Sequence, residues 1–411
     1  MWRPLRGGVA SPGAAVAAHS EALGSTSAIR RGLSQREVHL ASRRLRLCLD
    51  DLYRQDVVEM IERETRQFAV WEISSPDDPD FRPAFDLLWA EFGSSGEMER
   101  EDAIRRFLLD DPWEPEPSGA FIRYFLLVAR GPDGEIRGVR DGSVIVHPFD
   151  EPDLCVVYLS HIVMRPEARG TVLSYWLRIC PVEIALGFLA GLHRRGLIAL
   201  PLPDKPSKGF GCRIDLCAEM EFFAPEDETS WRRMLFYGRG GFDVIDPRHF
   251  AYLQPDFRAP DVVEATGWQP IPFLVLVRRM GREREARMPI TEACAIARRL
   301  YDDFACHCPE EDLEDNLGMV LGKLDERAKT HAHVDLLPLP TGPKDLMRFR
   351  PLLRRSAYER HYVGTTPIVD RYLKEAPTID VGRFLADLAE RLRQRPRAVF
   401  ADRERAGVEP E

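Results

Sequence analysis

Apolar positions in this chain change from helical spacing to strand-like alternation, and these changes predict an ordered series of elements. A capping box formed by Ser34 and Glu37 precedes apolar residues at every third or fourth position up to about Glu64, which predicts a helix. The period then becomes strand-like, and Gly131-Pro-Asp-Gly134 separates two apolar runs as in a tight hairpin. The predicted elements are a strand from residue 67, helices at 81–92 and 98–109, and hairpin strands at 121–130 and 136–147.

A long apolar run, Leu154–Met164, predicts a central strand that is covered on both faces. It continues into a Pro-Glu-Ala-Arg-Gly loop and then into a helix that extends to about Arg195. After a linker at 201–211, the even positions of 213–222 are apolar and the odd positions are mostly charged, which predicts another strand. A helix from Pro225 to Gly240-Gly241 and strands near 242–245 and 273–279 complete this series.

Beyond Arg287 the strand pattern stops, and helical segments follow one another between proline and glycine breaks. These helices span 291–304, 311–329, 343–358, 367–374 and 381–393. We therefore expect four regions: a disordered, low-complexity N-terminus (1–33), an N-terminal helix (34–66), a mixed α/β domain (67–282) and a C-terminal helical domain (283–411).

Composition and charge exclude several classes of protein. The 411 residues are 44% apolar, enough for a core, and a net charge of −9 argues against a nucleic-acid partner, which needs clustered cations. The longest apolar stretch, Pro181–Leu192, includes Glu183 and is shorter than a membrane span. The eight cysteines include no CxxC pair, which favours a reducing compartment and a cytoplasmic protein. An organellar transit peptide is the alternative interpretation of residues 1–33.

The loop after the central strand is the first candidate for chemistry. Residues 165–174 lead from a strand into the N-terminus of a helix, where free backbone amides and the helix dipole converge. Such a turn can hold a pyrophosphate without a basic patch, although an ordinary turn has a similar composition. A second feature follows further along the chain, where Phe236-Tyr237-Gly238-Arg239-Gly240-Gly241-Phe242 closes a helix before a strand.

Together these two segments resemble the GNAT superfamily of acyl-CoA-dependent N-acyltransferases. Met164-Arg-Pro-Glu-Ala-Arg-Gly170 is similar to the first half of the family's V-x-P-x-x-R-G-x-G-x-G/A loop, and Tyr237 with Gly241-Phe242 is similar to its Tyr-x-x-x-Gly-Phe element. The order of predicted elements over residues 67–280 is also similar to that fold. The resemblance implies an α/β (α+β) fold with a mixed central sheet of six to seven strands flanked by helices, to which the C-terminal all-α domain is added.

The resemblance also implies roles for individual residues. Tyr237 would be the general acid that protonates the CoA thiolate, with a core tyrosine as the alternative. Ser230 stands where many relatives carry a cofactor-contacting asparagine, and Val172 is bulkier than the family's usual residue, which argues for weaker phosphate binding. The implied cofactor-binding set is the backbone of Ile162, Val163 and Met164 for pantetheine, and Arg169, Gly170, Thr171, Val172, Leu173 and Ser174 for the pyrophosphate.

Acyl transfer to an amine also requires a base and a stabilised oxyanion. Glu219 and Glu221 share one face of their predicted strand, where burial would raise the pKa of a carboxyl group enough for it to accept an amine proton. A solvated edge strand is the alternative. Ser160 on the central strand is a further catalytic candidate, and His161, on the opposite face, is either a base or a core residue with satisfied hydrogen bonds.

The sequence therefore predicts a cytoplasmic N-acyltransferase that moves an acyl group from acetyl-CoA, or another acyl-CoA, to an unidentified amine. We expect no metal, because Cys306-His307-Cys308 and His331-Ala-His333 lack the ligand spacing of a structural zinc site. We expect neither nucleic acid nor a membrane as a partner, and a homo-oligomer stays open. The alternative is a catalytically weak or inactive protein of the same fold that binds acyl-CoA or a partner.

Overall fold

The computed structural model of the chain describes residues 68–93, 96–171, 173–199, 212–222, 228–305, 308 and 310–340. The predictions for residues 1–66 and for the three helices beyond residue 341 lie outside this part. The helices are α5 (Phe81–Phe92), α6 (Glu101–Phe107), η3 (Pro166–Ala168), α7 (Leu173–Arg194), α8 (Glu228–Arg239), α9 (Pro260–Thr266), α10 (Ile290–Phe304) and α11 (Glu310–Ala328). The strands are β1 (Ala69–Ile73), β2 (Phe121–Arg130), β3 (Ile136–Val146), β4 (Leu154–Tyr158), β5 (Ile162–Met164), β6 (Arg213–Glu221), β7 (Asp243–Ile245), β8 (Tyr252–Gln254), β9 (Ile271–Arg279), β10 (Arg287–Pro289) and β11 (His333–Pro338).

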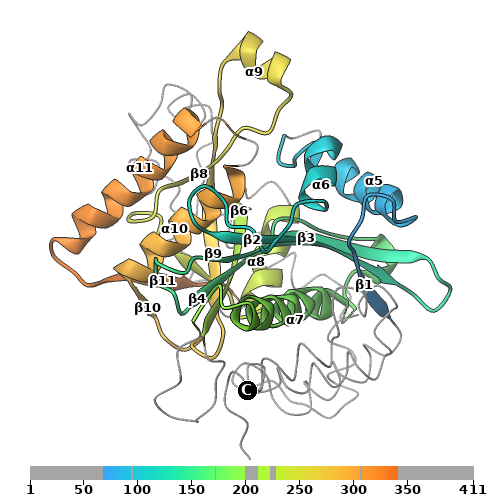
Figure 1. Cartoon of the computed structure of the whole chain (residues 1–411), viewed down its shortest axis with the longest axis horizontal. Coiled ribbons are helices and arrows are strands. Elements are labelled where there is room, and N and C mark those ends of the chain that lie inside the picture. Colours follow the sequence, from blue (N-terminus) through green and yellow to red (C-terminus); the bar gives the residue numbers. More distant parts are fainter. Residues whose placement is uncertain are drawn as a thin grey trace, which may run out of the picture.

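One mixed sheet of 11 strands forms the centre of the molecule (Figure 1). Its order is β1-β2-β3-β4-β6-β9-β7-β11-β10, with β5 paired to β3 and β8 paired to β9. β4 and β6 run parallel because α7 crosses between them, and the other pairs are antiparallel. The mixed α/β class is as predicted. The predicted six to seven strands are too few. β8 and β10 have 3 residues each and are too short to show a period, the predicted strand 154–164 forms both β4 and β5, and β11 lies in the region that was predicted to be helical.

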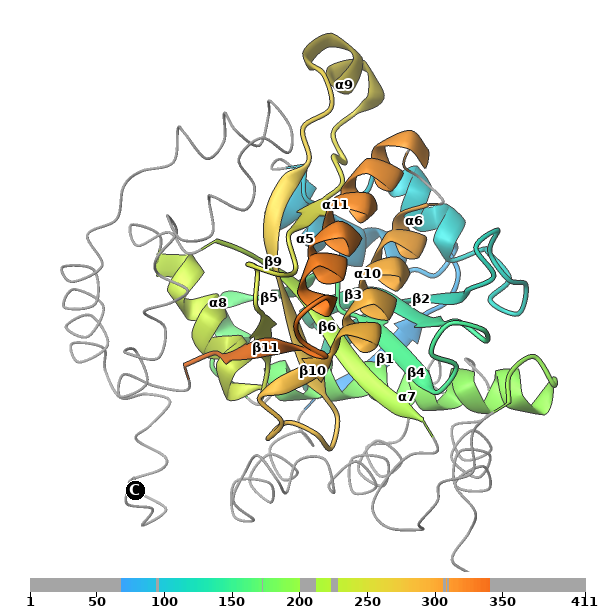
Figure 2. The same cartoon turned by 90° about the vertical axis from the view of Figure 1, so that its left-hand side faces the viewer.

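Helices cover both faces of this sheet (Figures 1 and 2). Even-numbered residues of β3 face α7: a Cβ on Gly138 would lie 3.1 Å from Leu177. Odd-numbered residues face the other side, where Val139 belongs to the same buried cluster as α5, and Ile145 to the same cluster as α10. The sheet therefore separates a layer of α7 and α8 from a layer of α5, α6, α10 and α11.

The hairpin and the helices before it lie close to their predicted positions. β2 and β3 form the hairpin, and Gly134 in its turn has φ of +82°, a conformation that costs glycine little. α5 has the predicted bounds and buries Phe81 and Leu88 from its apolar stripe. α6 is shorter than the predicted 98–109, because it begins only at Glu101 after an extended Arg100.

α7 is the central helix of its layer, and almost all of its surface is covered. By length and apolarity alone it is sufficient to cross a bilayer, but 83% of its most apolar 18-residue window is buried inside the protein. The apolar run Pro181–Leu192 alone is too short for a membrane span. The helix is longer, because its apolar residues continue on both sides of that run. Such burial is typical of a core helix packed on a sheet.

The prediction that the strands stop near Arg287 is wrong. β11 pairs with β7 in the main sheet, and β10 pairs with β11. α10 and α11 occupy nearly their predicted ranges but pack on the sheet, where Phe304 of α10 stacks edge-on against Tyr158 of β4. Residues 287–338 therefore extend the sheet and are not an all-helical domain.

Candidate active site

A β-bulge in the middle of the sheet creates the candidate site. β3 pairs with β4 up to Tyr158 and with β5 from Ile162, and one more residue lies on the β4–β5 side than on β3 between these points. Gly142 lies opposite the bulge, and a Cβ there would be 2.0 Å from the Tyr158 carbonyl oxygen, so a side chain does not fit. The predicted single strand Leu154–Met164 is therefore wrong in its middle, because the bulge divides it into two strands.

The bulge separates two parallel neighbours in the sheet. β4 and β6 pair from Leu154 to Tyr158, after which β5 continues along β3 while β6 continues along β9. A cavity of about 110 Å³, called the cleft below, opens between the diverging strands. It is lined by Phe92, Glu97, Ser160, His161, Ile162, Glu219, Met220, Glu221, Arg233, Phe236, Tyr237, Gln254 and Phe273.

Four predicted catalytic residues meet at this cleft. Tyr237, Glu219, Glu221 and Ser160 all line it, although they come from a helix, a strand and the bulge. Tyr237 belongs to the buried cluster on the α7–α8 face of the sheet. Glu219 has the same strand parity as Cys217, which is buried on the opposite face. The cleft thus passes through the sheet, with Tyr237 at one face and Glu219 at the other.

Glu219 has the properties of a base near neutral pH. Burial raises the pKa of Glu219 to about 7, against hydrogen bonds from Tyr252 and Tyr158 and the charge of His161, which lower it. The Tyr252 hydroxyl donates to Oε1 of this carboxyl group. A carboxyl group with such a pKa exchanges protons readily at physiological pH.

His161 is held as a cation and does not offer a free nitrogen. Its Nδ1 lies 3.0 Å from Oδ1 of Asp141, and its Nε2 lies 2.9 Å from the backbone oxygen of Glu97. Burial lowers the pKa of His161, but the Asp141 carboxylate outweighs burial and raises this pKa to about 9. Both ring nitrogens then donate, so this structure favours the core interpretation of His161 over a base.

Glu221 is tied to α8, the helix that carries Tyr237, although strand alternation starts its side chain on the same face as Glu219. Arg233 of α8 forms an ion pair with Glu221. Tyr237, which is 6% exposed, contacts Phe236 and Phe242 edge-on. The turn after α8 is fixed by the Phe242 amide, which donates to the Tyr237 backbone oxygen at 3.1 Å. The motif Tyr-x-x-x-Gly-Phe therefore sets the position of the phenol.

β5 presents one open backbone edge to the cleft. The amides of Asp141 and Arg165 donate across the β3–β5 pair, so by alternation Val163 also exchanges its hydrogen bonds with β3. The backbone groups of Ile162 and Met164 point away from β3, and Met164 oxygen accepts from Nε of Arg169 at 3.0 Å. Of the three residues predicted to pair with pantetheine, Ile162 and Met164 are oriented for it.

The predicted pyrophosphate loop is exposed and ordered by its own side chains. Gly170 has φ of +81°, which favours glycine. The Thr171 hydroxyl accepts from the Leu173 amide at 3.3 Å, and Ser174 Oγ donates to the Thr171 oxygen at 3.4 Å. One amide at the start of α7 is therefore already hydrogen-bonded, and the Arg169 side chain already donates a hydrogen bond to Met164. Val172 and the side chain of Ser230 lie outside the described residues.

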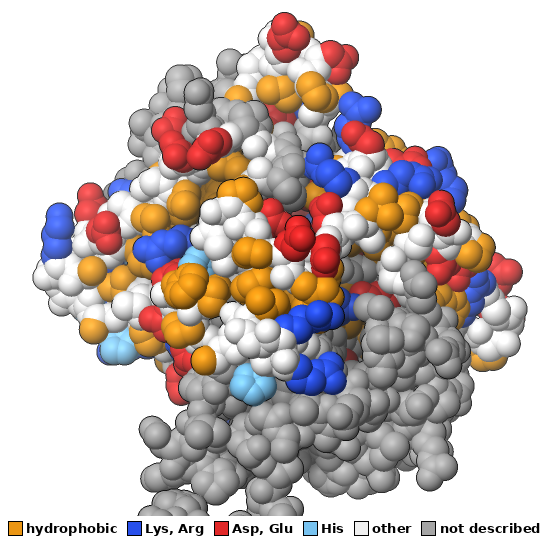
Figure 3. Space-filling model, viewed as in Figure 1, with side chains coloured by type: hydrophobic (Ala, Val, Ile, Leu, Met, Phe, Trp, Pro, Cys, Tyr) orange, Lys and Arg blue, Asp and Glu red, His pale blue; other side chains and the backbone are white. Residues whose placement is uncertain are grey.

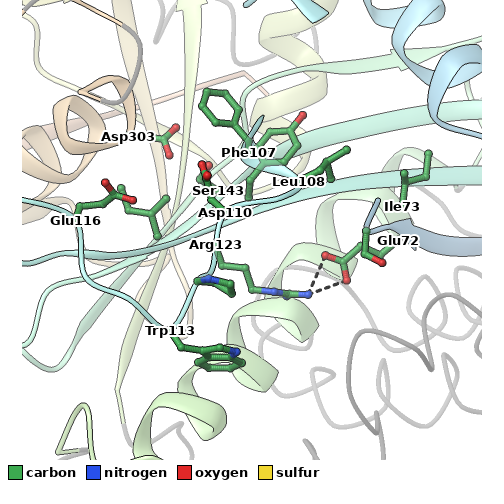
Figure 4. A pocket seen from close by; sticks show the side chains of 14 residues that line it. Glu72, Ile73, Phe107, Leu108, Asp110, Trp113, Glu116, Arg123, Ser143 and Asp303 are labelled. Atoms are coloured by element: carbon green, nitrogen blue, oxygen red, sulfur yellow. Dashed lines mark hydrogen bonds and ion pairs between the residues drawn. The ribbon is translucent and has the colours of Figure 1, made fainter. Parts of the chain in front are cut away.

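A second cavity, called the acidic pocket below, has a lining from both faces of the sheet, from Asp303 of α10 to Trp113, which packs on Phe188 of α7 (Figure 4). Its volume is about 250 Å³, and Glu72, Asp110, Glu116 and Asp303 line it together with aromatic side chains. Glu72 pairs with Arg123 at 2.8 Å, and burial raises the pKa of Asp303 to about 8. Acidic side chains gather near the middle of the side of the molecule shown in the space-filling view (Figure 3).

A buried hydrogen-bond chain joins the two cavities. Tyr124, which lines the acidic pocket, donates to Oδ2 of Asp141 at 3.0 Å. Oδ1 of Asp141 accepts from the backbone amide of His161, which lines the cleft, at 2.8 Å. The wall between the cavities is therefore polar and rigid.

Sequence reasoning missed two residues near the cleft. Gln254 lies on β8, which was not predicted, and its Oε1 has no hydrogen-bond partner among the described residues although the side chain is 3% exposed. Arg140 lies on β3 opposite Ile162 and is fully buried. The hairpin pattern predicts the strand that contains Arg140 but not the burial of its side chain, because arginine is usually exposed. Among the described residues, no group of three or more His, Cys, Asp or Glu is arranged to hold a metal ion.

Comparisons with known proteins give little beyond this geometry. No family model matches the chain, and no curated protein matches it. Among solved structures, the chain is similar to a Klebsiella pneumoniae protein provisionally named an acyl-CoA N-acyltransferase. The identity is 15% and the TM-score 0.23, over 52% of this chain and 97% of that one. The function is therefore argued from the cleft.

Proposed function

We propose that this protein is an acyl-CoA-dependent N-acyltransferase that acts in the cleft. The observation that carries the proposal is the divergence of β5 and β6, with Tyr237 on one face of the opening and Glu219 on the other. A thioester that enters from the α7–α8 face and an amine that enters from the opposite face would meet between these two side chains.

The α7–α8 side of the cleft has the features that a pantetheine chain requires. The open edge of Ile162 and Met164 offers amide donors and acceptors to the amides of such a chain, as a neighbouring strand would. The exposed loop at Gly170 continues from this edge to the first turn of α7, where the helix dipole favours phosphate. Neither contribution depends on a basic patch, in keeping with the net charge of −9.

The opposite side of the cleft is rich in hydrogen-bond acceptors. Glu219 and the unpartnered Oε1 of Gln254 face the same small cavity. A buried acceptor without a donor is costly, and an incoming amine would supply the missing N–H groups. This arrangement favours a cationic amine that loses a proton to Glu219.

Two of the proton transfers in the reaction have a side chain to carry them. Glu219 accepts one proton from the ammonium group, which leaves a neutral nucleophile to attack the thioester carbonyl carbon. The carbon–sulfur bond then breaks with its electron pair on sulfur, and Tyr237 donates its phenolic proton to that sulfur. The attached nitrogen loses its second proton to solvent, and the free thiol and the neutral amide leave. Solvent then returns a proton to the phenol, and Glu219 releases to solvent the proton that it accepted.

Calorimetric titration with acetyl-CoA, followed by a thiol-release assay over a panel of amines, tests the proposal. We expect binding, turnover of at least one amine, and a loss of about 10²–10⁴-fold in kcat for Tyr237→Phe. Tyr301→Phe is the matched control, since its hydroxyl binds the Leu253 oxygen at 2.8 Å, outside the cleft. Tighter binding of long-chain CoA than of acetyl-CoA would indicate a longer acyl group.

The alternative is a protein that binds acyl-CoA without turnover. It is favoured by the Thr171 hydroxyl, which already satisfies the Leu173 amide in the phosphate-binding turn. Binding without turnover, unchanged in Tyr237→Phe, would support this alternative and contradict the enzyme.

A further inference from the structure

Arg140 is a buried cation without a counter-charge in the described part of the chain. Its side chain is fully buried, and Nε, Nη1 and Nη2 have no hydrogen-bond partner among the described residues. Burying an ionised group without partners is among the costliest arrangements in a protein. A negative charge that forms beside such an arginine would offset this cost.

The carboxylate next to Arg140 in sequence raises the pKa of Arg140 but forms no hydrogen bond with it. Strand alternation directs Arg140 to the α7–α8 face and Asp141 to the opposite face. There the two oxygens of Asp141 accept hydrogen bonds from Tyr124 and His161. Asp141 is thus already neutralised by His161.

The phenol of Tyr237 lies on the same face of the sheet as Arg140, whose register partner Ile162 lines the cleft together with Tyr237. Burial lowers the pKa of Arg140, the neighbouring Tyr237 opposes this effect, and Arg178 of α7 adds to it. The geometry between guanidinium and phenol falls short of a hydrogen bond. Arg233 of α8 also faces Tyr237, but it is paired with Glu221.

Other tyrosines around the cleft have the opposite environment. Tyr158 and Tyr252 lie beside Glu219, and burial together with this carboxyl group raises the pKa of both phenols well above 10. The phenols of Tyr158 and Tyr252 therefore keep their protons at neutral pH. Tyr237 differs because Arg140 and Arg233 both interact with it.

We propose that Arg140 is a positioning residue that stabilises the negative charge on Tyr237 after the phenol has given up its proton. The inference rests on the proposed function, in which sulfur takes the electron pair of the carbon–sulfur bond and Tyr237 supplies the proton. The phenolate that remains lies beside the guanidinium, and a fixed cation at this point lowers the free energy of the step. Solvent then reprotonates the phenol and restores the unpaired arginine.

Absorbance titration of the phenol in ligand-free protein tests this inference directly. To isolate the signal of Tyr237, the absorbance titration of the same protein carrying Tyr237→Phe is subtracted from that of each protein. We expect the midpoint of this difference titration to lie about one pH unit or more higher in Arg140→Met, because the variant loses a nearby opposite charge. Arg140→Lys keeps a charge and should show a smaller shift than Arg140→Met. It replaces the methionine variant if that variant does not fold.

Arg123→Met is the control, because it also removes a buried guanidinium but one that pairs with Glu72. It should leave the Tyr237 titration in place. An unchanged titration in both Arg140 variants would overturn the inference. A shifted titration in a protein that turns over no amine would support the role of Arg140 and contradict the proposed function, so the two failures are distinguishable.

Discussion

At Glu219, burial and hydrogen bonding act against each other and leave the carboxyl group near its midpoint at neutral pH. Burial raises the pKa of Glu219 to about 7, whereas the cationic His161 and two tyrosine hydroxyls lower it. His161 in turn stays charged because Asp141 lies 3.0 Å away. The Asp141–His161 pair thus contributes to lowering the pKa of the predicted base, after the hydrogen bonds from Tyr252 and Tyr158.

Glu219→Gln should remove the acidic limb of the pH profile. A base acts when deprotonated, so kcat/KM of the native protein should rise with pH up to about 7 and then level off. The glutamine variant should lose about 10²–10⁴-fold in kcat and show no such rise. Thiol release measured between pH 5 and pH 9 gives both quantities.

Asp243→Asn is a suitable comparison for this experiment. Burial raises the pKa of Asp243 to about 6, but this residue lies on β7, away from the cleft. The variant should keep the acidic limb of the native protein. An acidic limb that survives in Glu219→Gln would assign the base to another group.

The residues of the site differ in how visible they are in the sequence. Tyr237 is found because its spacing to Gly241-Phe242 resembles a motif, and Glu219 because strand alternation places it on a polar face. Gln254 and Arg140 carry no such sign. Their importance comes from missing hydrogen-bond partners, and partners depend on how distant strands meet in the sheet.

At the scale of elements, the sequence predicts long periodic segments well and the break between β4 and β5 not at all. The apolar run continues through the bulge, so its pattern is that of one strand. The break is caused by Gly142 on the partner strand, which allows the Tyr158 oxygen to approach closely. A pattern along one strand does not reveal a distortion that its neighbour imposes.

Gly142→Ala should damage the cleft together with the fold. The new Cβ would meet the Tyr158 backbone oxygen at 2.0 Å, and relief requires the bulge to shift. We expect a loss of about 1–3 kcal/mol in the free energy of unfolding, measured in urea, and a loss of acetyl-CoA binding.

Gly187→Ala separates this effect from the general cost of replacing glycine. Gly187 lies within α7, and a Cβ there meets nothing within 4 Å. This variant should be as stable as the native protein or up to about 1 kcal/mol more stable, since alanine favours helix. Equal stability of the two variants would contradict a steric role for Gly142.

At the scale of the whole molecule, a buried ion network ties the segment after residue 283 to the sheet. Glu292 of α10 has a fully buried side chain and accepts from Arg213 of β6 and from Arg282, each at 2.8 Å. Arg282 also donates to Asp215 of β6 at 2.7 Å. The composition of helices and loops predicts a boundary here, but these charge pairs and the β7–β11 pairing cross it.

Glu292→Ala should therefore weaken the sheet and not α10 alone. Removing one partner of a buried charge network leaves arginines uncompensated, and we expect a loss of about 3–5 kcal/mol in the free energy of unfolding. Tryptophan fluorescence in urea measures this effect on the sheet, because all 7 tryptophans precede residue 283. Arg298→Ala breaks the exposed pair with Asp150 and should cost less than about 1 kcal/mol. If residues 283–340 folded as a separate unit, Glu292→Ala would leave the fluorescence transition where it is in the native protein and change only the helical signal.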